Sequence, residues 1–148
     1  IILFTSCGGK KIVRQSKHVI KGNWTLSQVT HNEEGNYNIS LLDDAPQLCF
    51  EGSSWQFVPN NNSGAYNFNS TNCDTQLRNF NFTIQEIDKV TGLYDFLLKP
   101  TDVKGKSINN NKGFRLKLTQ LSDTNMQWQQ TVNVNGKPFT INMNFIKQ

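Results

Sequence analysis

The sequence predicts an all-β fold, namely an eight-stranded antiparallel up-and-down β-barrel with one short helical segment. Apolar residues alternate with polar ones in eight separate segments, which is the pattern of half-buried strands. Most connections between those segments are short and rich in turn residues, which favours pairing between strands that are neighbours in sequence. A closed barrel leaves no free sheet edge, whereas a two-sheet sandwich would need longer crossovers.

The apolar rows of the eight predicted strands follow one another along the chain. Within a row the residues are two apart, so their side chains share one face and the polar residues between them face solvent. Gln28 continues the first row, and Gln130 lies on the same face as the seventh. The rows are, in chain order, Trp24, Leu26 and Gln28; Trp55 and Phe57; Tyr66 and Phe68; Phe80, Phe82 and Ile84; Tyr94, Phe96 and Leu98; Phe114, Leu116 and Leu118; Met126, Trp128, Val132 and Val134; and Phe139, Ile141, Met143 and Phe145.

Polar runs rich in glycine, asparagine and proline separate these rows. Asn135-Gly136 lies between two alternating runs and is a strong signal for a two-residue hairpin. The runs 59–64 (PNNNSG), 89–92 (KVTG) and 121–125 (LSDTN) predict further tight turns, and 102–113 predicts a longer polar loop.

Residues 38–50 (NISLLDDAPQLCF) depart from the period of two. They predict one short helix or helical turn that ends at Pro46, because proline cannot continue a helix, and that leads to Cys49. The length of 148 residues fits one domain, and we find no internal repeat.

The charge is distributed unevenly along the chain. Five basic residues and no acidic one precede Gly22, whereas ten basic and eleven acidic residues follow from there on. The formal net charge of +4 therefore belongs to the N-terminal segment, and the body is nearly neutral. A neutral body does not favour a nucleic-acid-binding face, and we expect no nucleic-acid partner.

The N-terminal run Ile1–Phe4 followed by Thr5, Ser6 and Cys7 resembles a bacterial lipobox. In that motif an apolar segment and two small residues precede a cysteine that becomes the lipidated first residue of the mature protein. It departs from the motif at Phe4, where leucine is usual. The alternative is a short apolar strand with a buried Cys7. The glycines and lysines after Cys7 have the composition of a flexible tether.

Export from the cytoplasm would allow a disulfide between the other two cysteines, Cys49 and Cys73. The alternative is two independent buried thiols. The sequence has no CxxC pair and no histidine at metal-ligand spacing, so we expect no metal site and no cofactor.

The body resembles the lipocalin-like domains of small bacterial lipoproteins. Residues 22–29 (GNWTLSQV) match the Gly-x-Trp opening of the first lipocalin strand, residues 55–73 have the aromatic strand, Asn/Gly turn, aromatic strand and Cys of those domains, and 115–147 resemble their closing hairpins. The resemblance implies that Gly22 and Trp24 plug one end of the barrel. The sequence departs from the family at Lys147, where lipocalins usually carry an arginine over the tryptophan. It also lacks a Thr-Asp-Tyr motif.

These patterns together divide the chain into three parts: residues 1–6 as the end of a lipoprotein signal peptide, 7–21 as lipidated Cys7 with a flexible basic tether, and 22–148 as the barrel. They predict a protein of the bacterial cell envelope, anchored by lipid to the outer membrane, on the periplasmic or the surface side. The anchor makes the membrane an expected partner.

The predicted function is non-covalent binding of a small hydrophobic molecule inside the barrel, since eight strands can enclose one small ligand. The alternative is an accessory interaction subunit of an envelope complex, whose barrel is filled by its own side chains and holds no ligand. The candidate cavity-lining residues are Phe68, Phe80, Phe82, Phe96, Leu116, Leu118, Trp128, Ile141, Met143 and Phe145.

Catalytic machinery is not indicated, and the protein is not expected to be an enzyme. His31 near Glu33 and Glu34 fits a solvated turn better than an acid–base or metal cluster, and Asp43-Asp44 fits a charged helix end. We find no serine elbow and no glycine-rich phosphate loop.

Overall fold

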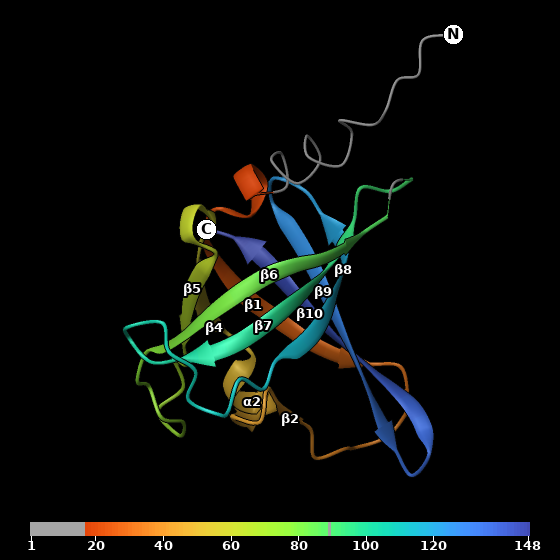
Figure 1. The fold of residues 1–148 in the computed structure, drawn as a ribbon. Coiled ribbons are helices and arrows are strands. Elements are labelled where there is room, and N and C mark those ends of the chain that lie inside the picture. Colours follow the sequence, from red (N-terminus) through yellow and green to blue (C-terminus); the bar gives the residue numbers. More distant parts are fainter. Residues whose placement is uncertain (1–16, 89) are drawn as a thin grey trace, which may run out of the picture.

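Eight antiparallel strands close a barrel in the computed structural model, which describes residues 17–88 and 90–148 (Figure 1). The order around the barrel is β1-β10-β9-β8-β7-β6-β5-β4, and β4 pairs with β1 to close it. The prediction of an up-and-down barrel is confirmed. The strands are β1 (Gly22–His31), β4 (Ser53–Val58), β5 (Ser63–Asn67), β6 (Arg78–Ile87), β7 (Tyr94–Thr101), β8 (Phe114–Leu121), β9 (Asn125–Val134) and β10 (Lys137–Lys147).

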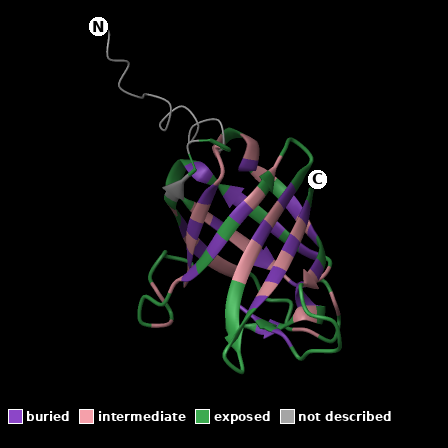
Figure 2. Cartoon of the chain, turned by 90° about the vertical axis from the view of Figure 1, so that its right-hand side faces the viewer, coloured by how far each residue is buried: buried purple, intermediate pink, exposed green. Residues whose placement is uncertain are grey.

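Buried and exposed positions alternate along the strands (Figure 2). In β7, for example, Tyr94, Phe96 and Leu98 are buried and the residues between them are partly exposed. The apolar face of each strand is thus turned into the barrel, as the period-two pattern predicts.

The first strand corrects one detail of the predicted pattern. Its pairing with β10 shifts between Leu26 and Gln28, which is the mark of a β-bulge. The extra residue exchanges the two faces, so Val29 is buried and Gln28 is exposed. The prediction that Gln28 continues the inward row was therefore wrong.

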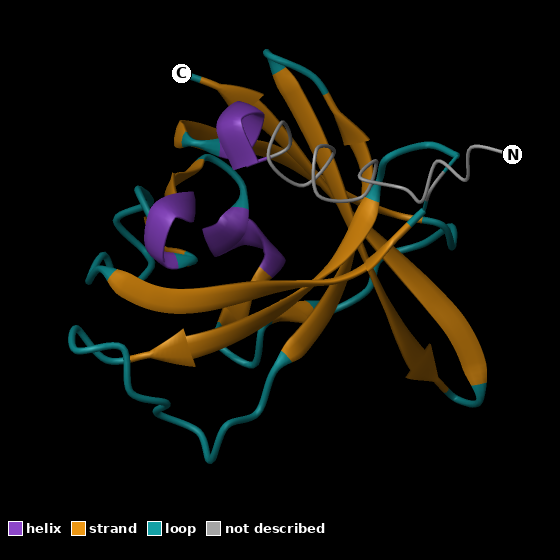
Figure 3. Cartoon of the chain, turned by 45° about the horizontal axis from the view of Figure 1, so that its top comes forward, coloured by secondary structure: helices purple, strands orange, loops and turns teal. Residues whose placement is uncertain are grey.

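The hairpin of β9 and β10 turns at Asn135-Gly136, as predicted, with positive φ angles of 52° and 78°. It extends past the end of the barrel (Figures 1 and 3), and β8 pairs with β9 only as far as Gln129. Val132 and Val134 are 36% and 39% exposed for that reason, so the buried face of β9 stops at Trp128. Between β4 and β5 the chain makes the short 3-10 helix η1 (Pro59–Asn61).

Residues 40–50 differ from the predicted single helix. They form a two-stranded hairpin, β2 (Ser40–Leu41) with β3 (Ala45–Pro46), and then the four-residue helix α2 (Gln47–Phe50). Pro46 precedes the helix instead of ending it, because the first helical turn needs no N–H from proline. The apolar spacing of Leu41, Ala45 and Cys49 is that of a helix, but the turn between β2 and β3 has positive φ at Leu42 and Asp43.

One end of the barrel is closed by a helical turn at residues 17–20, which the sequence assigned to the tether. The Trp24 indole N–H donates to the Ile20 carbonyl (2.9 Å), and both residues are buried. The Lys147 ammonium donates to the Val19 carbonyl (2.6 Å) and lies 5.2 Å from the centre of the Trp24 ring. Trp24 thus lies at the closed end, and residues 17–20 belong to the packed body. Within the described part of the chain, no helix is long and apolar enough to span a bilayer.

Candidate functional site at the barrel mouth

The ten predicted cavity-lining residues lie together in the barrel, and all are buried. They pack against each other and against Trp55 and Phe57, largely edge to face. The Trp128 ring centre lies 5.0 Å from that of Phe145 and 5.2 Å from that of Phe96, and Trp55 lies 5.4 Å from Phe145. These are the separations of rings in direct contact. A great part of the interior is therefore occupied by the side chains themselves.

The mouth, opposite the closed end, is covered by β2, β3 and α2 (residues 40–50), which we call the cap. Its Leu41, Leu42 and Phe50 side chains are buried, and the Phe50 ring centre lies 4.9 Å from that of Phe68. Ser53 donates a hydrogen bond to the Phe50 carbonyl (2.5 Å) and accepts one from the Trp55 indole N–H (2.8 Å). The cap therefore plugs the barrel with apolar side chains.

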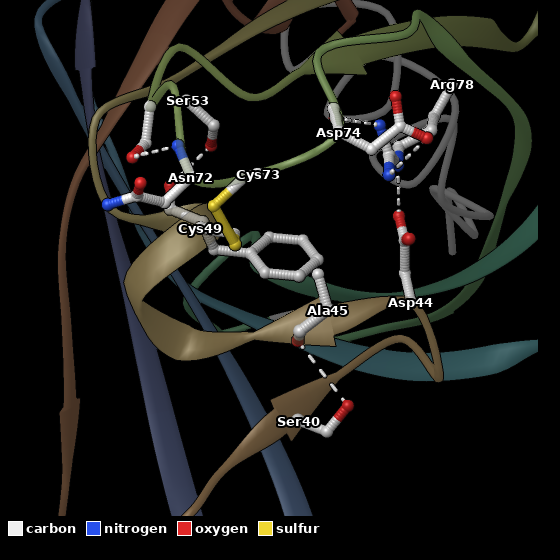
Figure 4. Close-up of a disulfide and its surroundings, with 11 residues drawn as sticks. Ser40, Asp44, Ala45, Cys49, Ser53, Asn72, Cys73, Asp74 and Arg78 are labelled. Carbon is white, nitrogen blue, oxygen red and sulfur yellow. Dashed lines mark hydrogen bonds and ion pairs between the residues drawn. A yellow bond between two sulfur atoms is a disulfide. The ribbon is translucent and has the colours of Figure 1, made fainter.

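A disulfide between Cys49 and Cys73 fastens the cap to the loop between β5 and β6 (Figure 4). The predicted pairing is confirmed. The two cysteines are 24 residues apart, so the bond closes a loop that contains all of β4 and β5. Figure 4 shows the ion pair between Asp44 and Arg78 beside the disulfide, to its right in this view.

The ion pair belongs to a polar cluster that joins the cap to two strands. Asp44 Oδ2 accepts hydrogen bonds from Arg78 Nε (2.5 Å) and from the Tyr66 hydroxyl (2.7 Å). Arg78 Nη1 also donates to the carbonyls of Asp74 and Gln76 (2.8 Å each), and its guanidinium lies 4.2 Å over the Phe68 ring. Burial, and then the bond to Asp44, raises the pKa of Tyr66 well above its usual value.

A hollow of about 490 Å³ lies beside this cluster, between the cap, the start of β6 and the 102–113 loop. We call it the mouth hollow. Three apolar side chains of its lining are largely exposed, namely Leu77 (62%), Val103 (86%) and Ile108 (66%). Four of its five charged residues form ion pairs, because Lys112 binds Asp43 and Arg78 binds Asp44. The fifth, Asp102, accepts hydrogen bonds from the backbone N–H groups of Lys104 and Lys106. The hollow is thus mainly apolar with a charged rim, and its size is typical of a small-molecule site.

None of the ten predicted lining residues contributes to the mouth hollow. Sequence reasoning missed it because its lining comes from loops and strand ends. The available signal was the presence of Leu77, Val103 and Ile108 in polar surroundings, outside any period-two row.

A second hollow, of about 450 Å³, lies beside His31 on the other side of the cap. His31 and Tyr37, whose ring centres are 5.2 Å apart, line it, and Phe139 packs on both (5.3 and 4.9 Å). His31 is therefore part of an aromatic cluster. Across residues 17–88 and 90–148, no three His, Cys, Asp or Glu side chains gather to hold a metal ion.

The remaining predicted sites belong to the N-terminal part of the sequence. Gly22 has a φ of 113°, which glycine adopts easily, and it begins β1 two residues before Trp24. The predicted lipidation site, Cys7, and the signal-peptide segment 1–6 lie outside the described residues. The chain matches no family model, and no curated protein or solved structure is significantly similar to it.

Proposed function

We propose that this protein is a lipid-anchored, lipocalin-like barrel of the bacterial envelope that binds a small hydrophobic molecule non-covalently. The observation that carries the proposal is the mouth hollow, where exposed apolar side chains surround a space of about 490 Å³. Exposed apolar side chains gathered in a concave surface are a feature of ligand sites. We assign the ligand to the mouth because the barrel interior is densely occupied by aromatic rings.

Two further observations support the location in the envelope. The disulfide between Cys49 and Cys73 is typical of proteins that mature in an oxidising compartment. The sequence around Cys7 resembles a lipobox, and lipidation there would anchor the chain to a membrane. Membrane fractionation of wild type and Cys7→Ser tests the anchor, and retention of the variant in the membrane fraction would contradict it.

The binding proposal is tested with a neutral fluorescent hydrophobe, N-phenyl-1-naphthylamine. Ile108→Asp places a charge in the mouth hollow, whereas Val90→Asp places the same charge at a residue that is 94% exposed and outside the hollow. We expect the wild type and Val90→Asp to enhance the probe's fluorescence equally, and Ile108→Asp to lose most of it. Equal fluorescence from all three proteins would contradict binding at the mouth.

One observation also favours the alternative, an accessory subunit of an envelope complex. A barrel filled by its own side chains, with a covalently fastened cap, is also a rigid platform for protein contacts. Crosslinking in intact envelopes distinguishes the two, because an accessory subunit should yield one reproducible partner, whereas a ligand carrier should not need one.

A further inference from the structure

The outer edge of β9 is one part of the barrel whose backbone has no partner strand. β8 pairs with β9 from Leu121 to Lys117, and its remaining residues pair only with β7. The end of β9, residues 130–134, therefore has β10 on one side and no strand on the other among the described residues. Figures 1 and 3 show this hairpin projecting away from the barrel, so a partner can approach the edge.

The direction of each backbone group follows from the pairing with β10. Thr131 lies opposite Thr140, whose N–H and carbonyl are both bonded to Asn32, on the side away from β9. In an antiparallel pair, opposite residues bond either to each other or both away from each other. Thr131 therefore directs its N–H and carbonyl outward, and so does Asn133, which lies opposite Pro138.

The β10 edge of the same hairpin is protected against pairing with another strand, whereas the β9 edge is not. On β10, Pro138 has no N–H and Asn32 covers Thr140. Proteins block exposed edges with proline, charged residues or bulges. Residues 125–136 (NMQWQQTVNVNG) contain no charged residue and no proline, so β9 carries none of these protections beyond Gln129.

We propose that the β9 edge pairs with the β9 edge of a second copy of this chain, antiparallel and about a two-fold axis at Val132. In that register Thr131 of each copy lies opposite Asn133 of the other copy. Both residues direct their backbone groups outward, so the two pairs each exchange N–H···O bonds in both directions. The register matches donor to acceptor without any change in the hairpin, and it brings two uncharged strands together.

A second copy suits this edge better than an unrelated peptide. An isologous contact needs a surface that complements itself. Residues 131–133 (TVN) form such a surface, because their outward backbone N–H and carbonyl groups are symmetric about Val132. The two Val132 side chains, each 36% exposed, would meet on one face of the new four-stranded sheet. The interface is small, so we expect weak association that strengthens with concentration.

The pairing is tested by crosslinking in a Cys7→Ser background. In the proposed register the two Val132 Cα atoms are about 4.5 Å apart, within disulfide reach. Val132→Cys should form covalent dimers under mild oxidation about tenfold faster than Val103→Cys, a residue that is 86% exposed and far from β9 in sequence. Equal rates for the two variants would overturn the proposal.

The backbone bonds are tested by adding Thr131→Pro to the Val132→Cys variant. Proline removes an N–H that faces solvent, which an edge strand tolerates, but it prevents pairing with a second copy. We expect the crosslinking rate to fall to that of Val103→Cys while the melting temperature stays close to that of the parent. If Thr131→Pro unfolds the chain, Thr131→Lys replaces it, with Gln56→Lys as its control, an exposed residue of β4 that is paired with β1 on one side and β5 on the other. Dimers that neither Thr131 variant reduces would contradict the β9 register.

Discussion

The disulfide gives the sharpest quantitative prediction. Replacing Cys49 and Cys73 by alanine opens a loop of 24 residues in the unfolded chain. In the chain-entropy model, the lost constraint costs about 3.5 kcal/mol at 25 °C. A domain of this kind is stable by about 5–15 kcal/mol, so the double variant should remain folded but lose a large part of its margin.

Urea unfolding followed by fluorescence measures this loss, since Trp24, Trp55 and Trp128 are all buried in the native state. With an m-value of about 2 kcal/mol/M, the midpoint should fall by nearly 2 M. Wild type reduced with dithiothreitol should unfold at nearly the same urea concentration as the double variant. A loss below about 1 kcal/mol would refute the reasoning, because the bond would then constrain little of the unfolded chain.

Three further predictions concern single side chains. Gly64→Ala should destabilise the barrel by about 2–3 kcal/mol in urea unfolding, because its new Cβ would clash with the Phe80 ring and lie 2.6 Å from the Gln56 carbonyl oxygen. An unchanged midpoint would contradict this close approach. The pKa of Tyr66 is raised in the folded state, so the contribution of the neutral hydroxyl to stability is complete below about pH 10 and is lost as the pH rises further. Above pH 10 the urea midpoint should therefore fall less in Tyr66→Phe than in wild type. Lys147→Ala should lower the free energy of unfolding by about 1–2 kcal/mol, since it removes both the contact with the Trp24 ring and the bond to the Val19 carbonyl. Lys147→Arg keeps the cation and should retain most of that stability. Equal urea midpoints for the two variants would show that the cation is unimportant.

The barrel could be predicted from the sequence because strand periodicity and turn chemistry are local properties. Asn135-Gly136 specified its hairpin, and alternation such as Phe114, Leu116 and Leu118 specified which face is buried. A bulge adds one residue to a strand without leaving a clear mark in the sequence, and for that reason the prediction that Gln28 faces the barrel interior was wrong.

The mouth could not be predicted, because its groups come together only in the folded chain. Asp44 and Arg78 are 34 residues apart, and Asp43 and Lys112 are 69 apart. In sequence Asp43-Asp44 resembles the end of a helix, whereas in the structure each residue pairs with a different cation. Long-range pairing of this kind gives no periodic signal.

The helical turn at residues 17–20 also sets the end of the barrel to which the proposed anchor would be attached. It packs on the closed end through Ile20 and Val19, so the chain enters the barrel at the end opposite the mouth. With the proposed lipid on Cys7, nine residues separate the anchor from this turn, so the anchor would be attached to the barrel at its closed end. The mouth hollow would then lie roughly 20–25 Å along the barrel from the end that carries the anchor, the height of eight to ten tilted strand residues. A ligand would therefore enter at the end of the barrel that does not carry the anchor.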